Sequence, residues 1–164
     1  MTNKMNRAAF ACLVLWQVAG TAAAQGGPSP AAQEITRAGA QASTSGPADF
    51  FTGRVRVDPV WPADEHMNSS GGLVTFEPGA RSAWHTHPAG QRLVIVAGVG
   101  LTQEWGKPMQ VIRPGDVVWC PPGIKHWHGA GPTTAMTHLA VTATRDGKNV
   151  TWMEKVSDDQ YNAR

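Results

Sequence analysis

Turn-forming residues divide most of the chain into short segments, and this division constrains the fold more than any other feature of the sequence. Pro88-Ala89-Gly90, Gly106-Lys107-Pro108, Arg113-Pro114-Gly115 and Arg145-Asp146-Gly147 are turn signals of this kind. The segments between them are too short for long helices, and several alternate apolar and polar residues. The pattern predicts an all-β domain.

The expected strands cover residues 52–57, 72–76, 82–87, 91–97, 100–105, 109–112, 117–119, 126–128, 134–142 and 150–153. A turn over Asn68 to Gly71 precedes the second of them. Eight or more short strands at this spacing favour a double-sheet barrel or a sandwich. Only residues 157–163 have the pattern of a helix, with Ser157 as N-cap and acidic residues in the first turn.

The first 24 residues have the pattern of a secretory signal peptide. Lys4 and Arg7 precede a short apolar run from Ala8 to Gly20, and Ala22-Ala23-Ala24 supplies small residues for cleavage. The run is shorter than the roughly 20 residues that span a bilayer. We therefore expect cleavage after Ala24, a periplasmic or secreted mature protein, and no stable membrane insertion.

The charge of the chain excludes several classes of partner. The sequence has 14 Lys and Arg against 12 Asp and Glu, and removal of Lys4 and Arg7 leaves a mature chain near neutrality. Such a chain has no strong field for nucleic acid or for an anionic membrane. Cys120 alone remains of the two cysteines, so no intramolecular disulfide is expected. We interpret Cys120 as a small buried side chain.

The mature chain is expected to have two parts. Residues 25–48 are small, polar and rich in Gly, Pro and Ser, which is typical of a flexible segment. Residues 34–37 within it are a candidate edge strand, in this chain or in a neighbouring subunit. Residues 49–164 form the expected folded domain.

Five of the six histidines fall on expected strands. His85 and His87 are two residues apart, as are His126 and His128, so each pair points to one side of its strand. Two such pairs on facing strands favour a transition-metal site, because imidazole is a common ligand for these ions. A single buried histidine is more often a satisfied polar residue, but two H-x-H pairs are much less frequent by chance.

Other residues have simpler interpretations. Trp84, Trp119 and Trp127 are expected as core or interface aromatics. Lys125 is a candidate for contact with an anionic substrate, although a lysine in a turn is more often solvated.

The two histidine pairs lie in motifs that resemble those of the cupins. The first motif is Gly79, His85-Thr86-His87, Gln91 and Gly98, and the second is Gly115, Pro121-Pro122-Gly123, His126 and Ala130. Gln91 replaces the usual Glu, and Ala130 replaces the usual Asn. The resemblance covers residues 79–130 and implies a single cupin (jelly-roll) β-barrel with the short helix at its C-terminal end.

Most of the mature chain also resembles the small bacterial manganese-dependent cupin hydroxynitrile lyases. The similar segments include TFEPGARSAWHTHPAGQ, GDVVW, KHWHGA and PTTAMTHLA. The metal ligands that this resemblance implies are His85, His87, Gln91 and His126. It implies one divalent ion per chain, which we expect to be manganese, with iron, zinc or nickel as alternatives. It also implies a small-molecule substrate. A homodimer or higher homo-oligomer is expected by the same analogy.

Four neutral ligands leave a dipositive ion with its full charge, which favours Lewis-acid chemistry. The resemblance implies cleavage or formation of cyanohydrins, with a histidine as general base. We assign that base to His138 and an assisting role to His128, with orientation of a metal ligand as the alternative role for either. A metal-dependent dioxygenase and a non-catalytic binding cupin stay open as alternative functions.

Overall fold

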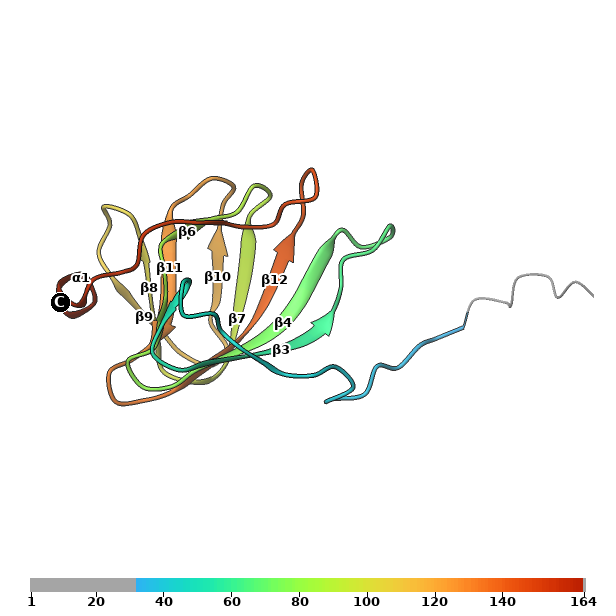
Figure 1. Ribbon diagram of the computed structural model, residues 1–164, viewed down its shortest axis with the longest axis horizontal. Coiled ribbons are helices and arrows are strands. Elements are labelled where there is room, and N and C mark those ends of the chain that lie inside the picture. The colour runs from blue at the N-terminus through green and yellow to red at the C-terminus, as the bar shows by residue number, and fades with distance from the viewer. Residues whose placement is uncertain (1–31, 164) are drawn as a thin grey trace, which may run out of the picture. The chain divides into compact units, whose positions relative to one another are not determined.

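The structure is a computed structural model that describes residues 32–163. The expected signal peptide, residues 1–24, and residues 25–31 of the segment that follows it lie outside the described residues. Residues 35 onward form one compact unit of β-strands with a single short helix near the C-terminus (Figure 1). Within the described residues, no helix has the length and apolar character needed to cross a membrane.

Two antiparallel sheets build this unit. The first has the strand order β1–β3–β4–β12–β7–β10. Its strands are β1 (Thr44–Ser45), β3 (Val55–Trp61), β4 (Ser69–Phe76), β12 (Met136–Ala143), β7 (Gln91–Gly98) and β10 (Val117–Cys120).

The second sheet has the order β13–β6–β11–β5–β2, with β8 and β9 attached through β11. Its strands are β13 (Thr151–Trp152), β6 (His85–Thr86), β11 (His126–Ala130), β5 (Arg81–Ser82), β2 (Phe51–Thr52), β8 (Gly100–Glu104) and β9 (Gln110–Ile112). Figure 1 shows the strands curling around a common interior. The all-β jelly-roll prediction is confirmed.

The main core is made of apolar side chains from both sheets. Phe76 and Leu93 come from the first sheet, Ala130 comes from the second, and none of them is exposed to solvent. A second cluster lies beneath the C-terminal segment and contains Trp84, Leu101, Trp127, Val156 and Tyr161. Burial of these side chains is the main source of stability, since the described chain has no disulfide.

The predicted helix is confirmed as α1 (Asp158–Asn162). Ser157 accepts a hydrogen bond from the Gln160 peptide N–H, and the Gln160 side chain accepts one from the Ser157 N–H, which forms a capping box. The buried Arg81 guanidinium holds the helix to the barrel through Asp158 and the Val156 carbonyl. The Tyr161 hydroxyl donates to the Ala130 carbonyl at 2.8 Å.

Two expected strands are divided. Residues 52–57 belong to β2 and β3, which lie in different sheets, because Gly53 at φ 78° turns the chain between them. A side chain at Gly53 would also meet Ala80 at 2.9 Å. Residues 82–87 are shared between β5 and β6.

The expected turn at residues 68–71 was wrong for its last three positions. Ser69, Ser70 and Gly71 extend β4, where they pair with β12. The Trp61 ring covers Gly71 so closely that a Cβ atom there would lie 2.4 Å from it. Close packing of the ring explains a glycine in a strand position.

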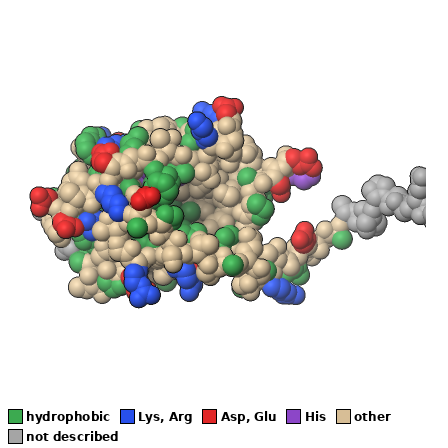
Figure 2. Space-filling view, viewed as in Figure 1, with side chains coloured by type: hydrophobic (Ala, Val, Ile, Leu, Met, Phe, Trp, Pro, Cys, Tyr) green, Lys and Arg blue, Asp and Glu red, His purple; other side chains and the backbone are tan. Residues whose placement is uncertain are grey.

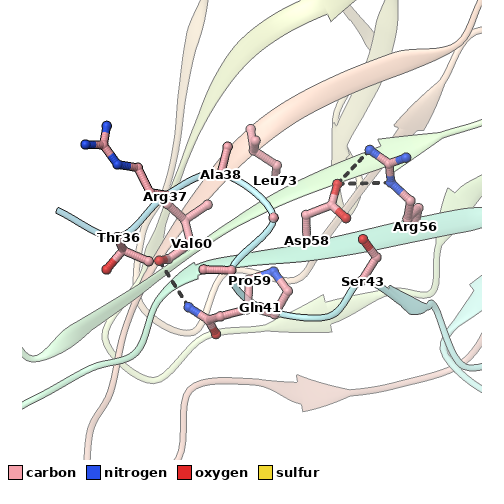
Figure 3. A pocket seen from close by; sticks show the side chains of 12 residues that line it. Thr36, Arg37, Ala38, Gln41, Ser43, Arg56, Asp58, Pro59, Val60 and Leu73 are labelled. Carbon is pink, nitrogen blue, oxygen red and sulfur yellow. Dashed lines mark hydrogen bonds and ion pairs between the residues drawn. The ribbon is translucent and has the colours of Figure 1, made fainter.

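Part of the segment expected to be flexible lies against the first sheet. Thr44 and Ser45 form β1, which pairs with the edge of β3. The amide nitrogen of Gln41 donates to the Val60 carbonyl at 3.2 Å, beside the Arg56–Asp58 ion pair (Figure 3). The candidate strand at residues 34–37 is absent from the described chain.

Candidate metal centre and active site

Five histidines converge at one end of the barrel interior. His85 stands directly opposite His126 in the β6–β11 register, and their ring centroids lie 4.3 Å apart. His87 follows β6, with its ring 5.0 Å from that of His85 and 5.4 Å from that of His126. His128 lies two residues along β11 from His126, and His138 comes from β12 in the other sheet.

Three of these rings are oriented by backbone carbonyls. The Nδ1 atoms of His85, His87 and His126 lie 2.9, 2.6 and 2.9 Å from the carbonyl oxygens of Ala83, Asn149 and Ile124. A carbonyl only accepts, so each Nδ1 carries the proton and donates it. Each Nε2 atom is therefore left with a lone pair. This is the tautomer that metal ligation through Nε2 requires.

Gln91 supplies an oxygen at the start of β7. Its Nε2 atom donates to the Thr142 hydroxyl at 2.9 Å, while its Oε1 atom is buried and has no hydrogen-bond partner. The Nε2 atoms of His87 and His126 are buried and unpartnered in the same way. Three acceptors left without donors fit a cation, because buried polar atoms are otherwise nearly always satisfied.

Ligand atoms of His85, His126 and His128 all lie within 4.8 Å of one another. This set shares two residues with the expected ligands and contains His128 in place of His87. His128 differs from the other candidates in its contacts, because its Nδ1 atom lies 3.1 Å from His138 Nε2. Three buried histidines can thus hold a metal ion here, and a fourth, His138, contacts one of them, His128.

Burial keeps the cluster uncharged. His138 is not exposed to solvent at all, and burial lowers its pKa to about 3. Burial lowers the pKa of His126 to about 4, and it lowers those of His85 and His128 well below the usual value. The pKa of His87 is also lowered by burial. All five rings are therefore neutral at pH 7, the form that binds metals or accepts a proton.

A cavity of about 560 Å³ opens onto this cluster. Its lining includes His85, His87, Gln91, His128 and His138. No Asp, Glu, Lys or Arg is among the described residues that line it. Figure 2 shows charged side chains of both signs scattered over the surface, with a hollow between them bordered by hydrophobic and uncharged groups.

Several residues of this cavity were missed by the sequence analysis. Phe50 stacks on Trp152 with ring centroids 4.8 Å apart, and Trp152 lies 4.8 Å from the His85 ring. Phe51 meets the same tryptophan edge-on. Together these rings form an aromatic wall beside the histidines. The only sequence signal that could have indicated this wall was the position of Trp152 on an expected strand.

The remaining sequence predictions have clear outcomes. Trp84, Trp127 and Cys120 are buried, as predicted, and burial raises the pKa of the Cys120 thiol to about 12. Trp119 is 46% exposed on the outer face of the first sheet. Lys125 lies outside the cavity, where its ammonium group pairs with Glu154.

Comparison with known proteins gives consistent results. Residues 72–142 match the cupin domain family. The (R)-mandelonitrile lyase of Granulicella tundricola is 60% identical over 128 residues, which cover 78% of this chain and 98% of that protein.

Solved structures give the same fold. A cupin-like protein from Thermotoga maritima is 38% identical, with a TM-score of 0.70 over 80% of this chain and 96% of its own. A cupin 2 conserved barrel protein from Rhodopseudomonas palustris, 19% identical, covers 73% of this chain and 79% of its own with a TM-score of 0.58, and so shows the fold alone.

The jelly-roll barrel and its interior histidine cluster define a small barrel protein with a site suited to a metal ion. The chain belongs to the cupin superfamily and, within it, to the hydroxynitrile lyase-like cupins. It is an enzyme of the lyase class.

Proposed function

We propose that this protein is a metal-dependent hydroxynitrile lyase, which cleaves cyanohydrins to an aldehyde and cyanide or forms them in reverse. The observation that carries the proposal is a cavity whose ionisable lining groups are neutral imidazoles. Such a site suits an uncharged substrate, because it offers no counter-ion to a carboxylate or an ammonium group. The 60% identity to an (R)-mandelonitrile lyase supports the same substrate class.

The metal ligands in this proposal are His85, His87, Gln91 and His126. The orientation of the three rings and the unpartnered Oε1 and Nε2 atoms support this set over one that contains His128. Manganese is the ion we assign, with iron, zinc or nickel as alternatives. A divalent ion held by neutral ligands supplies Lewis acidity that polarises a substrate oxygen.

We assign the transfer of the substrate hydroxyl proton to His138 and His128. His138 Nδ1 is buried without a hydrogen-bond partner, whereas His138 Nε2 is engaged with His128. We assign the hydroxyl proton of the cyanohydrin to this free Nδ1 atom. As the proton leaves, the oxygen electrons form the aldehyde C=O bond, and the pair of the breaking C–C bond departs with cyanide.

The low pKa of His138 affects the two halves of this cycle differently. Burial keeps the ring unprotonated at neutral pH, so its lone pair is available, but it also makes the ring a weaker base. Once protonated in the same buried surroundings, the ring returns the proton readily to cyanide. His128 shares the added charge through the 3.1 Å hydrogen bond.

Cyanide release and oxygen uptake, measured together, test the lyase proposal. Purified protein, assayed with racemic mandelonitrile, is expected to release cyanide above the uncatalysed rate in air and in oxygen-free buffer alike. Oxygen-dependent turnover with no cyanide release would favour a dioxygenase instead. Bound metal with no turnover of any kind would make the protein a binding cupin.

We further propose that two copies associate through the outer face of the first sheet. Val96 on β7 and Val117 and Trp119 on the adjacent β10 are 52%, 57% and 46% exposed. Arg92 is the charged residue of this strip, and its guanidinium lies 4.7 Å from the centroid of the Trp119 ring. A mainly apolar strip on the outer face of an antiparallel sheet is unusual for a monomer, since that face is commonly polar. A second copy of the strip is a suitable cover, because a symmetric dimer joins identical patches.

A further inference from the structure

We infer that the exposed turn at residues 145–149 positions the proposed ligand His87, so that metal binding and the closed turn stabilise each other. The closed turn is the conformation in which the Asn149 carbonyl reaches the His87 ring. The inference rests on the proposed metal site and concerns a segment that supplies no ligand itself. It begins from a difference among the three imidazoles that donate to backbone carbonyls.

Two of these rings are oriented locally, and the third is not. The acceptors of His85 and His126 are carbonyls two residues earlier in the chain, so each of these rings is held by its own stretch of backbone. His87 instead donates to the carbonyl of Asn149, 62 residues away in the sequence, at 2.6 Å. The orientation of the His87 ring therefore depends on where a separate segment of the chain lies.

That segment is a tight turn that projects beyond the end of β12 (Figure 1). All five of its residues, 145–149, are exposed. Asp146 and Gly147 both have positive φ, 51° and 73°, as in the type I′ turns that Asp-Gly sequences favour. Arg145 and Lys148 close the turn by exchanging two backbone hydrogen bonds. The turn is thus regular in itself but lies away from the core.

Among the hydrogen bonds of the described residues, the bond to His87 is the one that ties this turn to another part of the barrel. A metal ion on Nε2 favours this bond, because it occupies the Nε2 lone pair and commits the proton to Nδ1. Without an ion, the neutral ring can place its proton on Nε2, and the bond to the carbonyl is then lost. Such coupling is reciprocal, so the closed turn raises the metal affinity by the factor by which the ion favours the closed turn.

Matched glycine substitutions test the effect of the turn on the metal site. Gly147→Val disfavours the closed turn, because β-branched residues rarely adopt positive φ. Gly106→Val is the control, since Gly106 has a φ of 76° in the exposed turn between β8 and β9, and a Cβ atom at either glycine would meet nothing within 4 Å. In calorimetric titration of the metal-stripped proteins, Gly147→Val is expected to bind Mn²⁺ about 10-fold more weakly than wild type or Gly106→Val. Gly147→Asn should restore most of the affinity, because Asn tolerates positive φ.

Limited proteolysis of the wild-type protein tests the reverse effect. Trypsin cleavage after Lys148 follows the population of the open turn, so saturating Mn²⁺ should slow it by a similar factor. Cleavage after Arg37, which is exposed and does not line the cavity, should keep its rate.

Thermal unfolding of each metal-free variant shows that the fold is kept. Equal losses of affinity in the two valine variants, wild-type affinity in Gly147→Val, or cleavage after Lys148 at the same rate with and without Mn²⁺ would overturn the inference. Failure of the wild-type protein to bind Mn²⁺ would instead overturn the proposed manganese site, and the inference with it.

Discussion

The imidazoles of His128 and His138 are joined by one hydrogen bond, with His138 Nε2 3.1 Å from His128 Nδ1. The two residues come from different sheets, so the bond crosses the barrel interior. Both rings are buried, which excludes bulk water from the exchange of a proton between them. In the proposed mechanism, the pair therefore acts as one proton acceptor beside the proposed metal ligands.

Replacement of His138 is expected to stop turnover while leaving the metal in place. His138→Ala removes the proposed base and none of the four proposed ligands, so cyanide release should fall by about 100-fold or more. Elemental analysis should give the wild-type metal content. His66→Ala is the matched control, since His66 is exposed and does not line the cavity. Unchanged cyanide release, or loss of the metal, would disprove the assignment of His138 as base.

The structure also predicts which histidine completes the ligand set. His87 offers an unpartnered Nε2 atom, whereas His128 is engaged with His138. His87→Ala should therefore purify with much less metal than wild type, and His128→Ala should keep its metal and lose activity. The opposite result in elemental analysis would assign the third imidazole ligand to His128.

Acid is expected to destabilise the metal-free protein through its buried histidines. The pKa of His138 is about 3 in the folded chain and about 6.5 in an unfolded one. Between these values the unfolded chain binds a proton that the folded chain does not. The free energy of unfolding therefore falls as the pH drops below about 6.5, by up to about 1.4 kcal/mol per pH unit for this residue, and its contribution is constant above that pH.

Urea unfolding between about pH 5 and pH 8 measures this dependence. His138→Phe removes one of the titrating groups and should give a shallower decline in acid than wild type. Identical slopes for the two proteins would show that His138 does not contribute.

The proposed dimer depends on the apolar strip formed by Val96, Val117 and Trp119. Trp119→Glu places a charge in the strip, and light scattering coupled to size exclusion should then report a monomer where wild type is a dimer. Val111→Glu is the control, because Val111 is 54% exposed but belongs to β9 in the other sheet. A monomeric wild type, or dissociation by both variants, would count against this interface.

Much of the fold followed from local sequence signals. Gly and Pro mark most strand ends, and Ser157 with the acidic residues that follow it marks the start of α1. The boundaries that failed depend on distant contacts. Residues 69–71 form part of β4 because Trp61 packs over Gly71 and because β12 pairs alongside.

The sequence predicted that the histidines of the candidate site would cluster, but it did not determine the role of each one. The H-x-H pairs indicated a metal-binding cluster, because their spacing fixes the side to which they point. The contacts that decide the roles of these residues come from elsewhere in the chain. Asn149 supplies its carbonyl from the segment before β13, and an irregularity in the β12–β7 pairing occurs just before His138. No local pattern reveals either feature.

Dependence of cyanide release on a bound metal tests the central claim most directly. Purified protein is stripped with a chelator, assayed with racemic mandelonitrile, and assayed again after addition of one equivalent of Mn²⁺ per chain. The proposal predicts background cyanide release from the stripped protein and recovery with Mn²⁺, and no recovery when His87→Ala is treated in the same way. Full activity in the stripped protein would contradict metal-dependent catalysis, and cyanide release at background in every state would contradict the lyase assignment.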